Sequence, residues 1–196
     1  MGVSILRLNS AGLPIDWLNW QEAVCLHARE LVSWTYGNEL MRVRGGHSRK
    51  TGEQTVIFLN SIIACKGKIY TKGRLDPPLT NKALFRRDHN TCLYCGNYFQ
   101  DSQLSRDHVY PISRGGQDSW TNVVTDCKSC NARKGNCLTK ECNLELLALP
   151  YCPNHAEYLA LSHSGRILGD QMAFLRKQFS ANSRSFWKDG DETVPS

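Results

Sequence analysis

Four cysteines in two Cys-x-x-Cys pairs carry the clearest chemical signal in this chain. The pairs are Cys92 with Cys95 and Cys127 with Cys130. Two thiolates at this spacing suit a tetrahedral zinc ion, because a tight turn brings both sulfurs to one side of the chain. The doubled pair therefore predicts a closed structural zinc site, in which no coordination position is left for a reacting water.

A polar set lies between the two pairs and directly after the second. The pairs are separated by 31 residues, which is more than the roughly 15 to 20 residues of a simple zinc ribbon. This longer loop contains the dipeptide Asp107-His108 and Asn122, and Asn131 follows the last cysteine. Histidine has the pKa range of a general base near neutral pH. Carboxylate and amide oxygens suit a hard divalent cation, so the set predicts a metal-assisted hydrolytic centre.

The order and spacing of these residues resemble the HNH endonuclease family. The matching pattern is Asp-His-x-x-Pro-x-x-x-Gly-Gly, then Asn-Val-Val, then Cys-x-x-Cys-Asn-x-x-Lys-Gly, over roughly residues 82–137. The resemblance implies the ββα-metal fold and metal-dependent cleavage of DNA that leaves 5′-phosphate and 3′-hydroxyl ends. Residues 5–36 are similar to the N-terminal part of stand-alone bacterial HNH proteins.

Within this resemblance each polar residue has an expected role. His108 is the general base that activates water, and Asp107 and Asn131 hold the catalytic divalent cation. The resemblance assigns Asn122 to orienting the histidine. Asn131 replaces the final histidine of the family name, and oxygen ligation there favours Mg²⁺ or Mn²⁺ over tight Zn²⁺ binding. Since Asp107 and His108 are adjacent, we expect a bend or bulge that turns both toward the phosphate.

Basic residues are concentrated upstream of the zinc motif. The net charge is +6, and residues 42–88 hold eleven Lys or Arg against three Asp or Glu. Such a stretch suits a polyanionic partner, here DNA, although solvated surface charges are the alternative. The basic loop 45–52 fits either a phosphate contact or a plain surface hairpin. The candidate phosphate contacts near the site are Arg86, Arg87, Arg114, Arg133 and Lys134.

The fold class predicted is α+β, with an HNH module and its four-cysteine zinc, a small α/β N-terminal region and C-terminal helices. We expect an N-terminal α+β region over 1–78, the nuclease module over 79–140, a helical segment over 141–179 and a loose tail over 180–196. Periodicity and capping residues predict helices over 20–34, 81–87 and 127–134, with one or two more within 155–179. They predict strands over 5–8, 40–44, 55–64, 104–109 and 122–125.

Two alternatives accompany this interpretation. Cys137, Cys142, Cys152 and His155 have a spacing that could form a second zinc site, but free cysteines are often simply buried. A zinc-stabilised module that binds nucleic acid without cutting it would need the cysteines and the basic surface, but not the four polar residues. The sequence has no secretory signal and no apolar run long enough for a membrane span, so we expect a cytoplasmic protein with no membrane partner. The oligomeric state is left open.

Overall fold

The computed structural model describes residues 4–47, 49–67 and 77–184. These residues form two units. The first contains residues 4–67 together with 163–178, and the second contains residues 77–162 together with 179–184. In this part of the chain no helix is long and apolar enough to cross a membrane.

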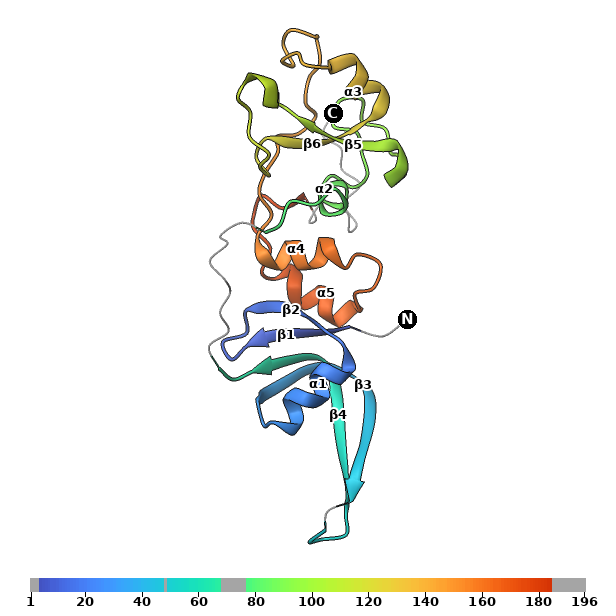
Figure 1. The fold of residues 1–196 in the computed structure, drawn as a ribbon, viewed down its shortest axis with the longest axis vertical. Coiled ribbons are helices and arrows are strands. Elements are labelled where there is room, and N and C mark those ends of the chain that lie inside the picture. Colours follow the sequence, from blue (N-terminus) through green and yellow to red (C-terminus); the bar gives the residue numbers. More distant parts are fainter. Residues whose placement is uncertain (1–3, 48, 68–76, 185–196) are drawn as a thin grey trace. The chain divides into compact units, whose positions relative to one another are not determined.

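The first unit is built on a four-stranded sheet in the order β2-β1-β4-β3 (Figure 1). Its strands are β1 (Ile5–Asn9), β2 (Pro14–Leu18), β3 (Val32–His47) and β4 (Gln54–Cys65). Strand β1 pairs antiparallel with β2 and parallel with β4, and β3 pairs antiparallel with β4. The predicted strand 5–8 is confirmed, whereas β2 lies where the turn residues around Pro14 gave no strand signal.

Helix α1 (Trp20–Ala28) begins with the capping box that Asn19 and Glu22 predict. The Asn19 side chain accepts from the Glu22 amide, and the Glu22 carboxylate accepts from the Asn19 amide, both at 2.8 Å. The helix was predicted to continue to residue 34 but ends earlier, because Glu30 adopts a left-handed φ of 55°. The following Val-Ser-Trp-Thr-Tyr run is β-branched and aromatic, and it pairs with β4 instead of continuing the helix.

Strands β3 and β4 are longer than the predicted strands 40–44 and 55–64. Their pairing extends from Val32 opposite Cys65 to His47 opposite Gln54. Alternating residues decide which face is covered: Val43 and Ile57 pack against the core of the unit, together with Leu59 and Ala23 of α1. Pairing between the two strands thus takes up part of the sequence that was predicted to be a flexible basic loop.

Helix α5 (Gly169–Arg176) belongs to the first unit although it is more than a hundred residues from the sheet in sequence. The buried Gln171 amide donates to the carbonyls of Ser4 and Ser61 at 2.8 Å each. The Asp170 carboxylate accepts from the Asn38 amide at 2.8 Å and from the Ser61 hydroxyl at 2.5 Å. These bonds satisfy buried polar groups at the sheet and fix where the helix docks.

The second unit contains the zinc motif and all of the predicted catalytic residues. Strands β5 (Leu104–His108) and β6 (Val123–Cys127) form an antiparallel pair, and α3 (Lys128–Lys134) follows β6 directly. The other elements are α2 (Asn81–Arg87), α4 (His155–Ser162) and the short 3-10 helices η1 (Asp101–Gln103) and η2 (Ile112–Arg114). The observed α+β content and the β-β-α order agree with the predicted fold class.

A small apolar core lies between α2, the two strands and α4. Its buried members are Ala83, Leu84, Phe85, Leu104, Trp120, Val123 and Leu161. A second cluster surrounds the cysteines and includes Leu93, Tyr94, Val124 and Leu144. Ser183 and Arg184 fall in the predicted loose tail, yet Ser183 is fully buried and Arg184 pairs with Asp88. The rest of that tail, residues 185–196, lies outside the described residues.

Arg87 is buried at the centre of the second unit. Its guanidinium donates to both carboxylate oxygens of Asp88 at 2.9 Å. It also donates to the carbonyls of Trp120, Val123 and Tyr151 at 2.8 to 2.9 Å. All five of its N–H groups are therefore used. The prediction that Arg87 contacts a phosphate does not agree with this burial: the side chain joins α2 to the loop before β6 and to the chain before α4.

Replacing Arg87 with leucine should destabilise the protein by about 3 to 5 kcal/mol, because the buried Asp88 loses its bidentate partner and three carbonyls lose a donor. Chemical denaturation followed by circular dichroism measures the change. The matched control is Arg133→Leu, at an exposed position in the same unit, which should change stability by no more than about 0.5 kcal/mol. Equal midpoints for the two variants would show that the buried pair is not a structural requirement.

Candidate functional site

The four cysteines come together within the second unit. The sulfurs of Cys92, Cys95, Cys127 and Cys130 all lie within 4.8 Å of one another. Four Zn–S bonds of about 2.3 Å in a tetrahedron require sulfurs about 3.8 Å apart, so a small contraction would complete the site. The donor set consists of thiolates alone, which suits zinc and leaves no open position for catalysis.

Local geometry explains why each pair is preformed. Gly96 follows the first pair with a left-handed φ of 76° and donates its amide to the Cys92 carbonyl at 2.9 Å, which closes a tight turn. Cys127 ends β6 and is the N-cap of α3, and its sulfur accepts from the Cys130 amide at 3.4 Å. The metal site thereby fixes both the end of β6 and the start of α3.

The second zinc site that Cys137, Cys142, Cys152 and His155 could form is not seen. Among the described residues, the only group of three or more His, Cys, Asp or Glu side chains with converging ligand atoms is the four-cysteine set. The Cys142 thiol instead donates to the Leu138 carbonyl at 3.3 Å.

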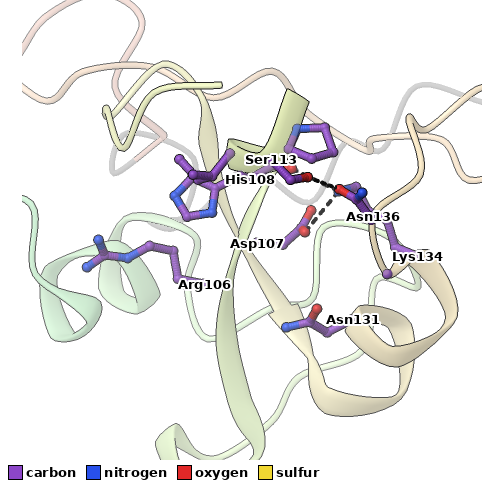
Figure 2. A pocket seen from close by; sticks show the side chains of 10 residues that line it. Arg106, Asp107, His108, Ser113, Asn131, Lys134 and Asn136 are labelled. Atoms are coloured by element: carbon purple, nitrogen blue, oxygen red, sulfur yellow. Dashed lines mark hydrogen bonds and ion pairs between the residues drawn. The ribbon is translucent and has the colours of Figure 1, made fainter. Parts of the chain in front are cut away.

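A pocket of about 280 Å³ lies where β5 ends and α3 faces it. It brings together three of the predicted catalytic residues, Asp107, His108 and Asn131. The complete lining is Arg106, Asp107, His108, Pro111, Ile112, Ser113, Asn131, Lys134, Gly135 and Asn136. Figure 2 shows Asp107 and Asn131 on the side of β5 that faces α3, with Arg106 and His108 on the other side.

The expected bulge between Asp107 and His108 is absent. Strands β5 and β6 pair in regular register from Leu104 opposite Cys127 to His108 opposite Val123. The two side chains therefore point to opposite faces of the strand, as its two-residue period requires. Both still line the pocket because His108 is the last residue of β5.

Lys134 was predicted to contact a phosphate, but its side chain is only 1% exposed and its ammonium binds inside the site. The Lys134 Nζ donates to Asp107 Oδ1 at 2.9 Å and to the His108 carbonyl at 2.8 Å. The other carboxylate oxygen of Asp107 accepts from the Tyr94 hydroxyl at 2.5 Å. Burial and the bond to Asp107 raise the pKa of Tyr94 well above its ordinary value, so this phenol stays a donor.

The His108 imidazole is held by Asp118, which the sequence analysis did not single out. His108 Nε2 lies 2.9 Å from Asp118 Oδ1, and Arg106 donates to both oxygens of the same carboxylate at 2.8 and 2.9 Å. Burial opposes ionisation of Asp118, but the bonds from His108 and Arg106 outweigh it and lower its pKa. An ionised carboxylate only accepts hydrogen bonds, so Nε2 carries the proton and Nδ1 keeps its lone pair in the neutral ring.

A chain of two hydrogen bonds orients Asn131, and the sequence did not predict it. Asn131 Nδ2 donates to the Ser105 hydroxyl at 2.9 Å, and that hydroxyl donates to Asp126 Oδ1 at 2.6 Å. Burial raises the pKa of Asp126 to about 6, and Asp126 Oδ1 is the acceptor of the Ser105 hydroxyl. The donor directions along this chain of hydrogen bonds then leave the carbonyl oxygen of Asn131 as its free polar atom.

Asn122 binds the loop after β5. Its side chain accepts from the Tyr110 amide at 2.9 Å and donates to the carbonyls of Tyr110 and Gln117 at 3.0 and 2.8 Å. The same loop contains Gly116, where an added Cβ would lie 1.9 Å from the Tyr110 carbonyl oxygen. Asn122 thus closes the turn that carries Asp118, and so reaches His108 indirectly.

The remaining basic candidates have different environments. Arg114 pairs with Glu141 at 2.8 Å on the surface, and Arg133 is exposed on α3. Arg86 is partly buried, and its guanidinium pairs with Asp101 at 3.2 Å. Of the five predicted phosphate contacts, Arg114 and Arg133 therefore have the most open side chains, whereas Arg87 and Lys134 are buried.

Replacing Cys127 with serine should abolish stoichiometric zinc and unfold the second unit, because this sulfur joins the end of β6 to α3 and a hydroxyl is a poor substitute for a thiolate. Zinc content by mass spectrometry of the purified protein and the melting temperature measure both effects. Cys25→Ser, at an exposed cysteine in the first unit, is the control and should keep full zinc. Retention of one zinc and of the melting temperature by Cys127→Ser would contradict a four-thiolate site.

Comparison with known proteins agrees with the geometry. Residues 92–147 match the family model described as HNH endonuclease. A search of curated proteins finds no match to the chain. The matched segment begins at the first zinc cysteine, contains every lining residue of the pocket and indicates a nuclease that acts on nucleic acid. Residues 92–147 are therefore similar to the HNH endonuclease family, as the order of the motifs predicted.

Proposed function

We propose that the second unit hydrolyses phosphodiester bonds in DNA, with His108 as the general base and with Asp107 and Asn131 as ligands of a divalent cation. The observation that carries the proposal is the pocket of about 280 Å³, which is lined by His108, Asp107 and Asn131 and so has an imidazole, a carboxylate and an amide in its wall. Arg114, Arg133 and Arg86 are the proposed phosphate contacts. The products would carry 5′-phosphate and 3′-hydroxyl ends.

The residues around Asp107 fit a cation. This carboxylate is only 6% exposed and has already attracted a positive charge, the Lys134 ammonium, at 2.9 Å. Each carboxylate oxygen has two lone pairs, so one bond from lysine and one from tyrosine leave acceptor positions. Asp107 and Asn131 together offer hard oxygen donors, which favour Mg²⁺ or Mn²⁺. When bound, the cation would neutralise charge on the phosphate and on the leaving oxygen.

His108 would act through Nδ1. The Asp118 carboxylate fixes Nε2 as the protonated nitrogen and holds the ring, so the lone pair of Nδ1 is available to accept a proton. A water that loses its proton to Nδ1 would attack the phosphorus as the P–O3′ bond breaks. The 3′ oxygen would leave with the bonding electrons and take a proton from solvent water to become a hydroxyl. General base catalysis of this kind contributes roughly 10²- to 10⁴-fold to the rate.

Lys134 would support this centre from within. Its bonds to the Asp107 carboxylate and to the His108 carbonyl join the two catalytic positions to one side chain of α3. A buried carboxylate without a cation would be costly, and the ammonium offsets that cost. We therefore assign Lys134 to the site itself rather than to the DNA-binding surface.

The alternative is a zinc-stabilised module that binds nucleic acid without cutting it. Binding alone would require the zinc site and surface cations. It would not require a carboxylate that holds the His108 ring. Nor would it require hydrogen bonds that bind the Asn131 amide nitrogen and leave its carbonyl oxygen without a partner in this network. This ordering of buried polar groups favours the catalytic function.

Replacing His108 with alanine should lower the rate of plasmid cleavage in Mg²⁺ or Mn²⁺ by about 10²-fold or more, because the base is lost. Gel analysis of supercoiled, nicked and linear plasmid measures the rate. DNA affinity without added divalent cation and zinc content should both stay at the parent values. The matched control is His155→Ala, at an exposed histidine of the same unit outside the pocket. A His108 variant that cuts as fast as the parent would rule out the assigned base.

Replacing Ser105 with alanine should raise the Mn²⁺ concentration needed for half-maximal cleavage by about 10- to 100-fold, because Asn131 loses the acceptor that orients its amide. The rate at saturating Mn²⁺ should recover most of its parent value. Ser129→Ala, on the exposed face of α3, is the control and should leave the titration unchanged. An unaltered Mn²⁺ titration for Ser105→Ala would argue against Asn131 as a ligand positioned in this way.

A further inference from the structure

Part of the β3–β4 pair extends beyond the rest of the sheet. Strand β1 pairs with β4 only from Ile62 to Cys65, so the segment 54–60 of β4 pairs with β3 alone. Figure 1 shows these two strands continuing as a ribbon past β1 and β2. We refer to residues 39–47 and 54–60 as the ribbon. An isolated two-stranded ribbon is at best marginally stable, so its persistence needs a cause.

One face of the ribbon packs on the core of the first unit, and this packing stabilises the ribbon. Val43 pairs with Ile57, and both pack against the core that includes Ala23 of α1 and the buried Leu59. The base of the ribbon is therefore anchored on one face. The opposite face has no such cover among the described residues of this unit.

The uncovered face combines cations with apolar side chains. Arg42 pairs with Phe58 and Arg44 with Val56, and paired residues lie on the same face. Phe58 is 49% exposed and Val56 is 40% exposed. The Arg42 guanidinium lies 5.2 Å from the centre of the Phe58 ring and also binds Glu39 at 2.6 Å. Arginines alternating with an aromatic ring are typical of surfaces that bind nucleic acid.

The charge balance of the ribbon and of the turn that joins its strands favours a polyanion. Residues 39–60 contain four Lys or Arg and two Glu. Two of the cations, Arg49 and Lys50, are exposed in the turn between the strands. Gly46 next to that turn has no atom within 4 Å of an added Cβ, which leaves open space beside the backbone. A surface made to pair with a second copy of the chain would instead bring like charges together.

We propose that the uncovered face of this ribbon binds the groove of duplex DNA. Two strands about 4.8 Å apart fit the major groove of B-form DNA, which is about 12 Å wide. Arg42 and Arg44 would then reach the phosphates that flank the groove, while Phe58 and Val56 contact its floor. The deep, narrow major groove of A-form RNA does not admit a ribbon, so the geometry favours DNA.

A DNA-binding site on the ribbon goes beyond the proposed function. It rests on the proposed function only for the choice of DNA as the partner. The ribbon belongs to the first unit and shares no residue with the catalytic pocket. It would supply affinity for duplex DNA that the nuclease module does not have alone. Binding measured without divalent cation tests the ribbon separately from cleavage.

The test compares full-length Arg42→Gln/Arg44→Gln with the parent by fluorescence anisotropy on a 24-base-pair duplex, without divalent cation. We expect Kd to rise about 10-fold or more near 0.1 M salt. The slope of log K against log salt should fall by about 2, because each lost phosphate contact removes about one unit. Arg42→Lys/Arg44→Lys should recover most of the affinity. The control is Arg29→Gln/Arg166→Gln, which removes equal charge from exposed positions of the same unit and should leave the slope nearly unchanged.

Four results would overturn the proposal. The Arg42→Gln/Arg44→Gln variant could show the parent slope and Kd. Alternatively, this variant and the Arg29→Gln/Arg166→Gln control could lose affinity equally, which would indicate that net charge alone sets the affinity. The parent could bind a double-stranded RNA of the same sequence as tightly as the DNA. The glutamine substitutions could change the oligomeric state by light scattering while DNA affinity stays, which would assign the ribbon to a second copy. In each case a His108-dependent plasmid cleavage would leave the proposed function standing.

Discussion

The second unit depends on four sulfur atoms held within 4.8 Å of one another. Two of them lie in the turn after the α2 segment, and two lie where β6 changes into α3. A module with so few buried apolar residues has little hydrophobic free energy to order its own loops. Coordination of zinc would supply that free energy and, by fixing the first turn of α3, would set the position of Asn131 and Lys134 opposite β5.

The second unit has two buried cations, Arg87 and Lys134, with different environments. Arg87 uses all five N–H groups on Asp88 and backbone carbonyls, so it joins elements far apart in sequence. Lys134 instead binds Asp107, a residue that lines the pocket. Both would count as surface charges in a sequence, because lysine and arginine are mostly exposed in proteins. Burial is tolerated here because each cation has an anion and carbonyl oxygens within hydrogen-bond distance.

The polar groups of the site are arranged by carboxylates that take no part in the proposed reaction. Asp118 decides which nitrogen of His108 carries the proton, and Asp126, acting through Ser105, decides which atom of Asn131 is free. Such second contacts are common around metal and acid–base sites, since a ligand or base is effective only when its orientation is fixed. The expected bulge is not needed, because the pocket lies at the end of β5, where residues from both faces of the strand can line it.

The sequence by itself determined the features that depend on neighbouring residues. Cys-x-x-Cys spacing located the metal site, and the Asn19–Glu22 capping box located the start of α1. The order of Asp107, His108, Asn122 and Asn131 carried the family resemblance, which the match over residues 92–147 confirms. Only the tertiary structure decided that Lys134 and Arg87 are buried, that Asp118 holds His108 and that β3 continues to His47. The i,i+3 spacing of Asn131 and Lys134 on α3 was the one local hint of a shared face. The contacts of His108 with Asp118 and of Lys134 with Asp107 join residues ten or more positions apart. Which of these residues meet is set by strand register and core packing rather than by local preference.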